Sequence, residues 1–336
     1  MDHPWSLIAP PVSGLVAPVR VDPEGKKGPT RGQARGSGWR RTSAGLVVPA
    51  DISDEPVEQR ILEAVAGAGP DAVVTGWAAL RLLGGGFFDG LARDGVTRLP
   101  VPIAANGGRV DPRAGVLLTR DRIPEDEVVI VHGMRCATAE RALFDEIRRL
   151  GRLEDQVVAA DMAFGGELTS IRRMRRYRWA RYWYRDVRRL DRVLPLASEH
   201  SRSRPETDFR LVWVQEVGWL DPLVNQEVRD LGGGFVGIPD LLDPKRGVAG
   251  EFAGAGHRLA EQHEDDLGRA DRFLRVGLQV VEVVRRDLDD VPRVRLRMTD
   301  AAERATLLPQ RWRLGRPPRC LDAELDRRDR RDAGNG

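Results

Sequence analysis

The chain has 336 residues, enough for about two domains of roughly 100–200 residues each. Its 54 Lys and Arg residues nearly balance its 51 Asp and Glu residues, so the net charge of +3 indicates no particular partner by itself. Lysine occurs only at positions 26, 27 and 245, which leaves few candidates for chemistry that needs a lysine, such as Schiff-base formation or a phosphate-binding loop.

The cysteine content and the hydropathy pattern indicate a compartment. Cys136 and Cys320 form no CxxC pair, which argues against a disulfide framework or a cysteine-based zinc site and is typical of a reducing cytosol. Prolines interrupt the first residues, where a signal peptide would need a continuous apolar helix, and no apolar stretch approaches about 20 residues. We therefore expect a soluble, cytoplasmic protein with no membrane partner.

The N-terminal half predicts a mixed α/β module. Residues 1–40 are rich in Pro, Gly and Arg and predict a flexible arm or the remnant of a small motif. Next we expect a hairpin over 39–48, a helix between 54 and 67, and a helix after Thr75 as its cap. Residues 95–131 predict strands, and helices follow over 138–150 and 153–166. These elements define a module over residues 41–165.

Residues 166–198 predict a basic helical connector. Ten arginines and two aspartates between positions 172 and 192 make a local charge of +8, so the remainder of the chain sums to −5. Arginines interleaved with aromatic residues can neutralise phosphates and stack on bases. The alternative is a connecting helix whose aromatic side chains pack inward while its arginines pair with the acidic remainder. The candidate nucleic-acid-binding residues are Arg172, Arg173, Arg175, Arg176, Arg178, Arg181, Arg185, Tyr177 and Trp179.

Residues 199–312 predict a second domain of order α-β-β-β-α-β. Its first helix has Ser203 as cap and Pro205 in the first turn, and three strands follow in PLVNQEV, GFVGIPDLLD and GVAGEFAG. A long helix over 258–275 precedes the strand LQVVEVV. The whole chain is therefore expected to be α/β (α+β), and the mixed-charge residues 313–336 predict a disordered tail.

Three carboxylates occupy informative positions in this domain. Glu206 lies in the first helical turn, Asp240 follows Pro239 at the end of the second strand, and Glu251 lies on the third strand. A hairpin of this length can bring Asp240 and Glu251 side by side. Converging carboxylates are how proteins hold Mg²⁺ beside a phosphate, although a single carboxylate is more often a surface or capping charge.

Residues 200–285 resemble the PD-(D/E)XK nuclease-like domain of actinobacterial proteins related to very-short-patch-repair endonucleases. The resemblance is carried by SRSRPETDFRL, GIPDLLDPKRGVAGEFAG and HRLAEQHEDDLGRADRFLRVGLQVVEV. Upstream, TRGQARGSGWRRTSAGLVVPA, VTGWAALRLLGGGFFDG and RALFDEIR are similar to the AbiEi-like antitoxin region. In that family a winged helix-turn-helix leads the chain, so residues 1–40 are also interpreted as its degenerate remnant.

The resemblance implies an acidic site of Glu206, Asp240 and Glu251 with Mg²⁺ as cofactor. Two residues after the strand glutamate the family has Lys or Asp, whereas this chain has Ala253, on the same strand face as Glu251. The similar families also place functional residues in the next helix, where this chain has His257, His263 and Asp266; a capping or surface role is the alternative for these. Lys245 lies in the turn between the strands and is not expected to replace the missing group.

Three hypotheses follow. The first is a DNA-acting protein with a restriction-endonuclease-like domain that hydrolyses phosphodiesters with a metal. The second keeps the fold without the chemistry, as a lapsed nuclease that binds nucleic acid in a repressor, antitoxin or defence role. The third is a protein-interaction module whose acidic remainder masks the basic segment.

Overall fold

The computed structural model describes residues 13–108, 110, 112–253 and 260–334, with only the backbone described for 260–267 and for 332. The described residues form two units, and helix α5 continues from one into the other. Of the described residues, the N-terminal unit comprises those from 13 to 151 together with Arg176–Leu190, and the C-terminal unit comprises Arg152–Arg175 and those from 191 to 334. The predicted mixed α/β class is confirmed.

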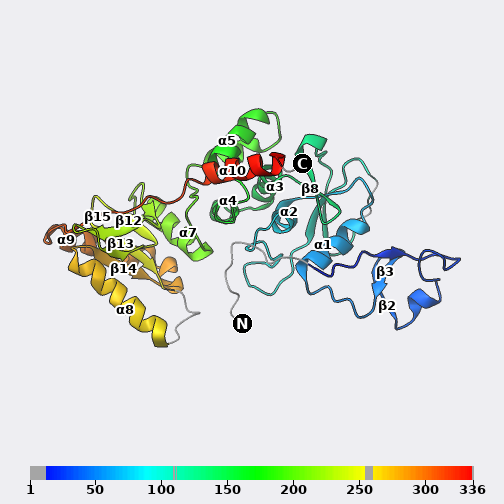
Figure 1. Ribbon diagram of the computed structural model, residues 1–336, viewed down its shortest axis with the longest axis horizontal. Coiled ribbons are helices and arrows are strands. Elements are labelled where there is room, and N and C mark those ends of the chain that lie inside the picture. Colours follow the sequence, from blue (N-terminus) through cyan, green and yellow to red (C-terminus); the bar gives the residue numbers. More distant parts are fainter. Residues whose placement is uncertain (1–12, 109, 111, 254–259, 335–336) are drawn as a thin grey trace. The chain divides into compact units, whose positions relative to one another are not determined.

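The N-terminal unit holds two sheets and three helices (Figure 1). Strands β1 to β3 form one small antiparallel sheet, and the other five form a mixed sheet of order β6-β5-β4-β8-β7. The elements are β1 (Val19–Arg20), β2 (Trp39–Ser43), β3 (Leu46–Pro49), α1 (Val57–Ala66), β4 (Val73–Val74), α2 (Gly76–Leu82), β5 (Val101–Ala104), β6 (Val116–Thr119), β7 (Val128–Val131), β8 (Met134–Ala137) and α3 (Ala139–Arg149).

The predicted hairpin and helices of this half are present as β2–β3, α1, α2 and α3. Helices α2 and α3 pack on each other and bury Trp77, Leu80 and Phe144 at 2% exposure or less. One predicted detail is wrong. Thr75 does not cap α2 through its side chain, because its hydroxyl donates instead to Asp145 of α3 at 2.6 Å.

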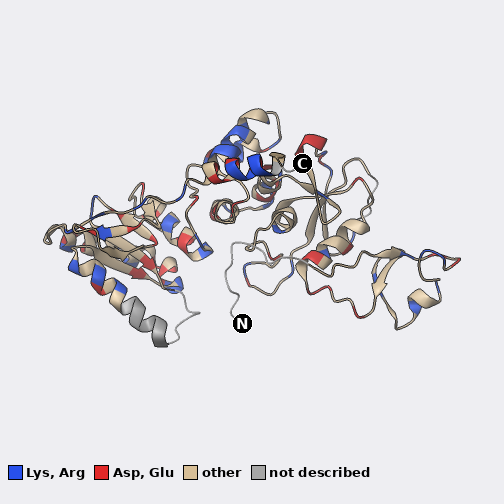
Figure 2. Cartoon of the chain, viewed as in Figure 1, with Lys and Arg blue, Asp and Glu red and all other residues tan. Residues whose placement is uncertain are grey.

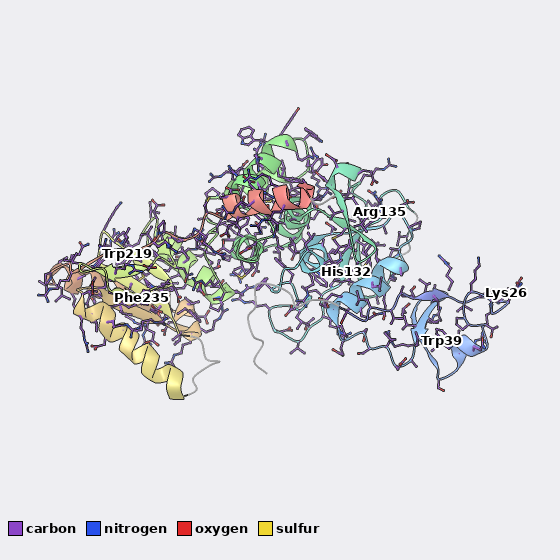
Figure 3. The ribbon with its side chains drawn as sticks, viewed as in Figure 1. Lys26, Trp39, His132, Arg135, Trp219 and Phe235 are labelled. Atoms are coloured by element: carbon purple, nitrogen blue, oxygen red, sulfur yellow. The ribbon has the colours of Figure 1, made fainter. Side chains whose placement is uncertain are left out.

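Residues 13–40 are partly built into the fold. Strand β1 pairs with β3, and a 3-10 turn covers Gln33–Arg35, while between residues 13 and 56 the structure has no α-helix. Figure 3 labels Lys26 and Trp39 in this region. The described part of the predicted flexible arm therefore contributes a strand to a small sheet.

The C-terminal unit contains a four-stranded sheet of order β14-β13-β12-β9 and a three-stranded sheet of order β11-β10-β15. In the larger sheet β13 runs antiparallel to β12 and parallel to β14, and the crossover between β13 and β14 contains α8. The elements are α4 (Leu153–Gly165), α5 (Ile171–Ala180), α6 (Leu190–Val193), α7 (Arg204–Leu211), β9 (Leu223–Val224), β10 (Val228–Asp230), β11 (Phe235–Gly237), β12 (Leu241–Asp243), β13 (Val248–Phe252), α8 (Ala260–Arg275), β14 (Gln279–Val283), α9 (Val291–Thr306), β15 (Trp312–Leu314) and α10 (Leu321–Gly334).

Three predictions for this half are corrected. The expected strand PLVNQEV is split into β9 and β10, which belong to different sheets, so five strands precede α8 instead of the three in the predicted α-β-β-β-α-β order. The expected strand GFVGIPDLLD is split into β11 and β12, with a bend at Pro239–Asp240 between them, because proline cannot donate to a strand ladder. Asp240 therefore precedes β12 instead of ending a strand. Residues 313–336 are not a disordered tail through 321–334, because α10 forms there and buries Leu321 and Leu325 at 5% and 1% exposure.

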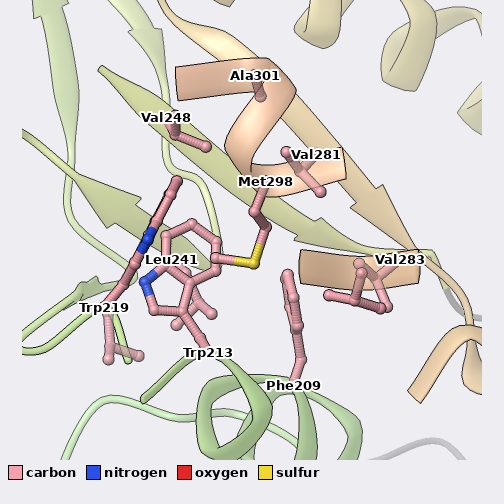
Figure 4. Packing of buried hydrophobic residues seen from close by; sticks show 11 residues of the cluster. Phe209, Trp213, Trp219, Leu241, Val248, Val281, Val283, Met298 and Ala301 are labelled. Atoms are coloured by element: carbon pink, nitrogen blue, oxygen red, sulfur yellow. The ribbon is translucent and has the colours of Figure 1, made fainter. Parts of the chain in front are cut away.

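The core of this unit is aromatic (Figure 4). Phe209 of α7 and Trp213 of the following π-helical turn, Val212–Glu216, are fully buried against β12, β13, β14 and α9. Gly250 of β13 makes room for them: a Cβ atom there would lie 2.7 Å from the Trp213 ring and 2.9 Å from the Phe209 ring. The predicted Ser203 cap is confirmed, since its hydroxyl oxygen accepts the Glu206 N–H, and Pro205 lies in the first turn. Among the described residues no helix is both long and apolar enough to cross a membrane.

Candidate acidic and arginine-rich sites

The predicted carboxylates Asp240 and Glu251 lie side by side. Leu241 pairs with Gly250 in the β12–β13 ladder, so the next position along places Asp240 opposite Glu251. The Asp240 Oδ2 atom accepts the backbone N–H of Phe252 at 2.7 Å, which holds the carboxylate at this end of β13. The bend after Pro239 thus delivers Asp240 to the predicted position.

Glu206 joins this cluster from the first turn of α7. Its carboxylate accepts the Ser203 hydroxyl at 3.0 Å, the Arg202 N–H at 2.9 Å and the Asn225 side-chain amide at 3.1 Å. The helix cap and the loop before β10 therefore both orient Glu206. We name Glu206, Asp240 and Glu251 the acidic cluster.

The electrostatics of Asp240 reflect its burial and the proximity of Glu206. Burial, followed by the negative charge of Glu206, raises the pKa of Asp240 to about 7. The Phe252 N–H and the positive charges of Arg269 and Arg202 oppose this shift. Burial and the nearby negative charge of Glu206 therefore favour the neutral form of the Asp240 carboxyl more than water does.

Glu251 has a charged partner of its own. Its side chain, on β13, is 9% exposed, and its Oε2 atom lies 2.9 Å from Nη2 of Arg269 on α8. The Arg269 side chain remains 38% exposed. The partly exposed Arg269 guanidinium thus neutralises Glu251, which is the most buried carboxylate of the cluster.

The described side chains of the acidic cluster are not grouped as a metal site. Across the described chain, no three or more His, Cys, Asp or Glu side chains are grouped so that they could hold a metal ion. Ala253 donates its N–H to Val283 O at 2.8 Å and offers only a methyl group on the face that Glu251 uses. Lys245 is exposed in the turn at the far end of the β12–β13 hairpin. His257 and the side chains of His263 and Asp266 lie outside the described residues.

The arginines that begin α5 are paired with carboxylates. Arg172 contacts Asp322 at 2.9 Å and Asp326 at 2.8 Å, and Arg173 contacts Asp326 at 2.9 Å and Asp329 at 2.7 Å. These aspartates lie one turn apart on α10. Figure 2 colours much of α5 as basic residues and α10 as residues of both charges. This part of the basic segment follows the alternative prediction, in which arginines pair with the acidic remainder.

Further along, part of the segment is anchored to a buried network. Arg181 contacts Glu127 at 2.6 Å, and Glu127 also contacts Arg141 at 3.0 Å. Arg141, 2% exposed, contacts Asp145 at 2.9 Å as well. The Tyr177 ring packs against a buried phenylalanine of α3, and burial raises the pKa of its hydroxyl. Tyr177 and Arg181 therefore hold the segment in place within the N-terminal unit.

Three aromatic side chains of the segment face solvent. Trp179, Tyr182 and Trp183 are 73%, 69% and 61% exposed. The Tyr182 and Trp183 rings meet edge to face with centroids 5.0 Å apart, and the guanidinium of Arg178 lies 5.0 Å from the centre of the Trp179 ring. We name the arginine–aromatic surface by its exposed members in the N-terminal unit: Arg176, Trp179, Tyr182, Trp183, Arg185 and Arg188. Arg175 is also exposed, at the last α5 position of the C-terminal unit.

The sequence interpretation omitted several residues that the structure brings to these sites. Asn225, Ser203 and Arg202 hold Glu206, although only the capping role of Ser203 had a sequence signal. The α10 aspartates were detectable as carboxylates spaced four and three residues apart, which places them on one helix face. Comparison with known proteins adds nothing to these assignments, since no family model, curated protein or solved structure matches the chain.

Proposed function

We propose that this protein binds nucleic acid that has unpaired bases, through the arginine–aromatic surface. The observation that carries the proposal is the exposure of Trp179, Tyr182 and Trp183 within one basic segment. Large aromatic side chains are normally buried or partly buried, so three exposed rings within five residues indicate a binding surface.

The chemistry of this surface suits a single strand. Unpaired bases stack on exposed aromatic rings, at about 1–3 kcal/mol per base, without regard to sequence. The exposed Arg176, Arg185 and Arg188 supply cations for the phosphates between the bases. The buried contacts of Tyr177 and Arg181 fix the backbone that carries the rings, which lowers the entropy cost of ordering them on binding.

We interpret the C-terminal unit, in line with this proposal, as a PD-(D/E)XK-like domain that keeps the fold of a nuclease but binds nucleic acid without cleaving it. The pairing of Asp240 with Glu251 and the helix-containing crossover from β13 to the parallel strand β14 are consistent with that interpretation. Ala253 and the ion pair of Glu251 with Arg269 favour binding over cleavage. A cytoplasmic repressor, antitoxin or defence role is consistent with the thiols of Cys136 and Cys320, which form no disulfide.

The test is fluorescence anisotropy with labelled single-stranded and duplex DNA. We expect wild-type protein to prefer the single strand and Trp179→Ala/Tyr182→Ala/Trp183→Ala to lose on the order of 100-fold in affinity. Phe235→Ala is the matched control, because Phe235 is 56% exposed on β11 of the other unit (Figure 3). Equal affinities for the triple variant and the control would refute the proposal. A binding constant insensitive to salt would favour the protein-interaction hypothesis.

A second candidate function, metal-dependent phosphodiester hydrolysis, is favoured by the position of Asp240 beside Glu251. Its test is a cleavage assay with Mg²⁺ or Mn²⁺ on duplex, mismatched and branched DNA, using wild type, Asp240→Ala and Ala253→Asp. Cleavage by wild type that Asp240→Ala abolishes would show an active nuclease. Cleavage by Ala253→Asp alone would show that the missing donor limits the chemistry.

A further inference from the structure

We infer that Arg269 is the permanent cation of the acidic cluster and excludes divalent metal ions from it. The inference concerns what occupies the cluster and does not depend on nucleic-acid binding elsewhere in the chain. It is carried by the 2.9 Å contact between Arg269 and Glu251 and by the absence of a metal-competent group among the described side chains.

Each carboxylate of the cluster is already engaged by donors from the chain. Glu206 accepts the Ser203 hydroxyl and the Asn225 amide, as described above. Asp240 accepts the Phe252 N–H, and Glu251 receives the Arg269 guanidinium. A metal ion would compete with these donors for the carboxylate oxygens, and Mg²⁺ also gives up its own water ligands reluctantly.

The charge of Arg269 adds to this competition. Its guanidinium pairs with Glu251 and also attracts the negative charge of Asp240, so one cation stabilises two carboxylates of the cluster. A divalent ion placed among these carboxylates would lie within a few ångströms of that cation and would be repelled by it. Arginine stays protonated at every physiological pH, so this repulsion cannot be relieved by loss of a proton.

The fold explains how Arg269 reaches the cluster. It lies on α8, which belongs to the crossover between the parallel strands β13 and β14, and Glu251 lies on β13 at the end from which that crossover starts. Ala253 presents only a methyl group two residues further along the same strand face. The chain thus lacks a donor at 253 and supplies a positive charge from α8, and both features remove the need for a metal.

The experiment measures Mn²⁺ binding to the full-length protein by calorimetry and by the Mn²⁺ electron paramagnetic resonance signal. We expect no binding to wild type below about 1 mM and a gain on the order of tenfold or more for Arg269→Gln, because Glu251 loses its cation. Arg275→Gln is the matched control: Arg275 pairs with Asp271 on the same helix, so the net charge changes equally away from the cluster. Arg269→Lys keeps the charge and should bind no better than wild type.

The outcomes decide the inference in both directions. Tight Mn²⁺ binding by wild type overturns it, whatever the variants do. A folded Arg269→Gln protein, verified by circular dichroism, that binds Mn²⁺ no better than the Arg275→Gln control also overturns it. If Arg269→Gln does not fold, the wild-type measurement and Arg269→Lys still decide, since a gain in the lysine variant would show that the charge is not what excludes the metal.

Discussion

If the protein binds nucleic acid as proposed, helix α10 should compete with it for the first arginines of α5, and this competition predicts a salt effect. In the variant Asp322→Asn/Asp326→Asn/Asp329→Asn, Arg172 and Arg173 lose the carboxylates that they contact at 2.7–2.9 Å. Two freed arginines can neutralise two more phosphates. For single-stranded nucleic acid, each neutralised phosphate contributes about −0.7 to the slope of log K against log salt. Two more phosphates should therefore make the slope steeper by about 1.4.

The exchange is energetically accessible because the Arg172 side chain is 53% exposed, and exposed ion pairs contribute roughly 0–1 kcal/mol. The assay is anisotropy of labelled single-stranded DNA across a salt series. A matched variant, Glu216→Gln/Asp221→Asn/Asp289→Asn, removes three exposed carboxylates elsewhere and raises the net charge from +3 to +6 in the same way. If both variants steepen the slope equally, the effect is one of overall charge and α10 does not compete for these arginines.

Three further predictions concern stability. Asp240 has a pKa near 7 in the folded protein and near 4 when unfolded, so the native state holds an extra proton between these values. The free energy of unfolding should therefore fall as pH rises from about 4 to 7, and Asp240→Asn should flatten that dependence in urea titrations. Arg141→Ala removes the buried cation that bridges Glu127 and Asp145, while their contacts with Arg181 and Arg148 remain. It should cost about 3 kcal/mol, the lower end of the range for a broken buried ion pair, and a loss under about 1 kcal/mol would contradict the network. Leu325 of α10 is 1% exposed, so Leu325→Ala should lower the free energy of unfolding by about 2–5 kcal/mol and speed amide hydrogen exchange in α10. Unchanged exchange in α10 would contradict the packing of this helix on the C-terminal unit.

Much of the fold was predictable where local patterns and tertiary packing agree. Helices α1 and α3 carry apolar stripes, α4 is buried over most of its length, and the Ser203 cap with Pro205 marks the start of α7 correctly. The pairing of Asp240 with Glu251 followed from the length of the intervening turn. Local signals sufficed at these positions because neighbouring residues supply the deciding hydrogen bonds.

Predictions failed where a distant partner decides the structure. Thr75 has the residue type of a helix cap, yet Asp145, 70 residues away, takes its hydroxyl. Residues 321–334 are too polar to predict a stable helix alone, and they are held by two leucines and by the arginines of α5. Arg269 was one of many arginines on a charged helix, and only the fold shows that it meets Glu251.

Gly250 links the interior of the C-terminal unit to its acidic cluster. The glycine lets the Phe209 and Trp213 rings lie against β13, and Phe209 is on the same short helix as Glu206. The residue after Gly250 is Glu251. A methyl group at position 250 would push α7 outward and carry Glu206 away from Asp240, although no carboxylate had been altered. The separation of Glu206 and Asp240 thus depends on how closely the Phe209 and Trp213 rings approach β13. Substitutions in the core can therefore change the geometry of the acidic cluster as much as substitutions of its carboxylates.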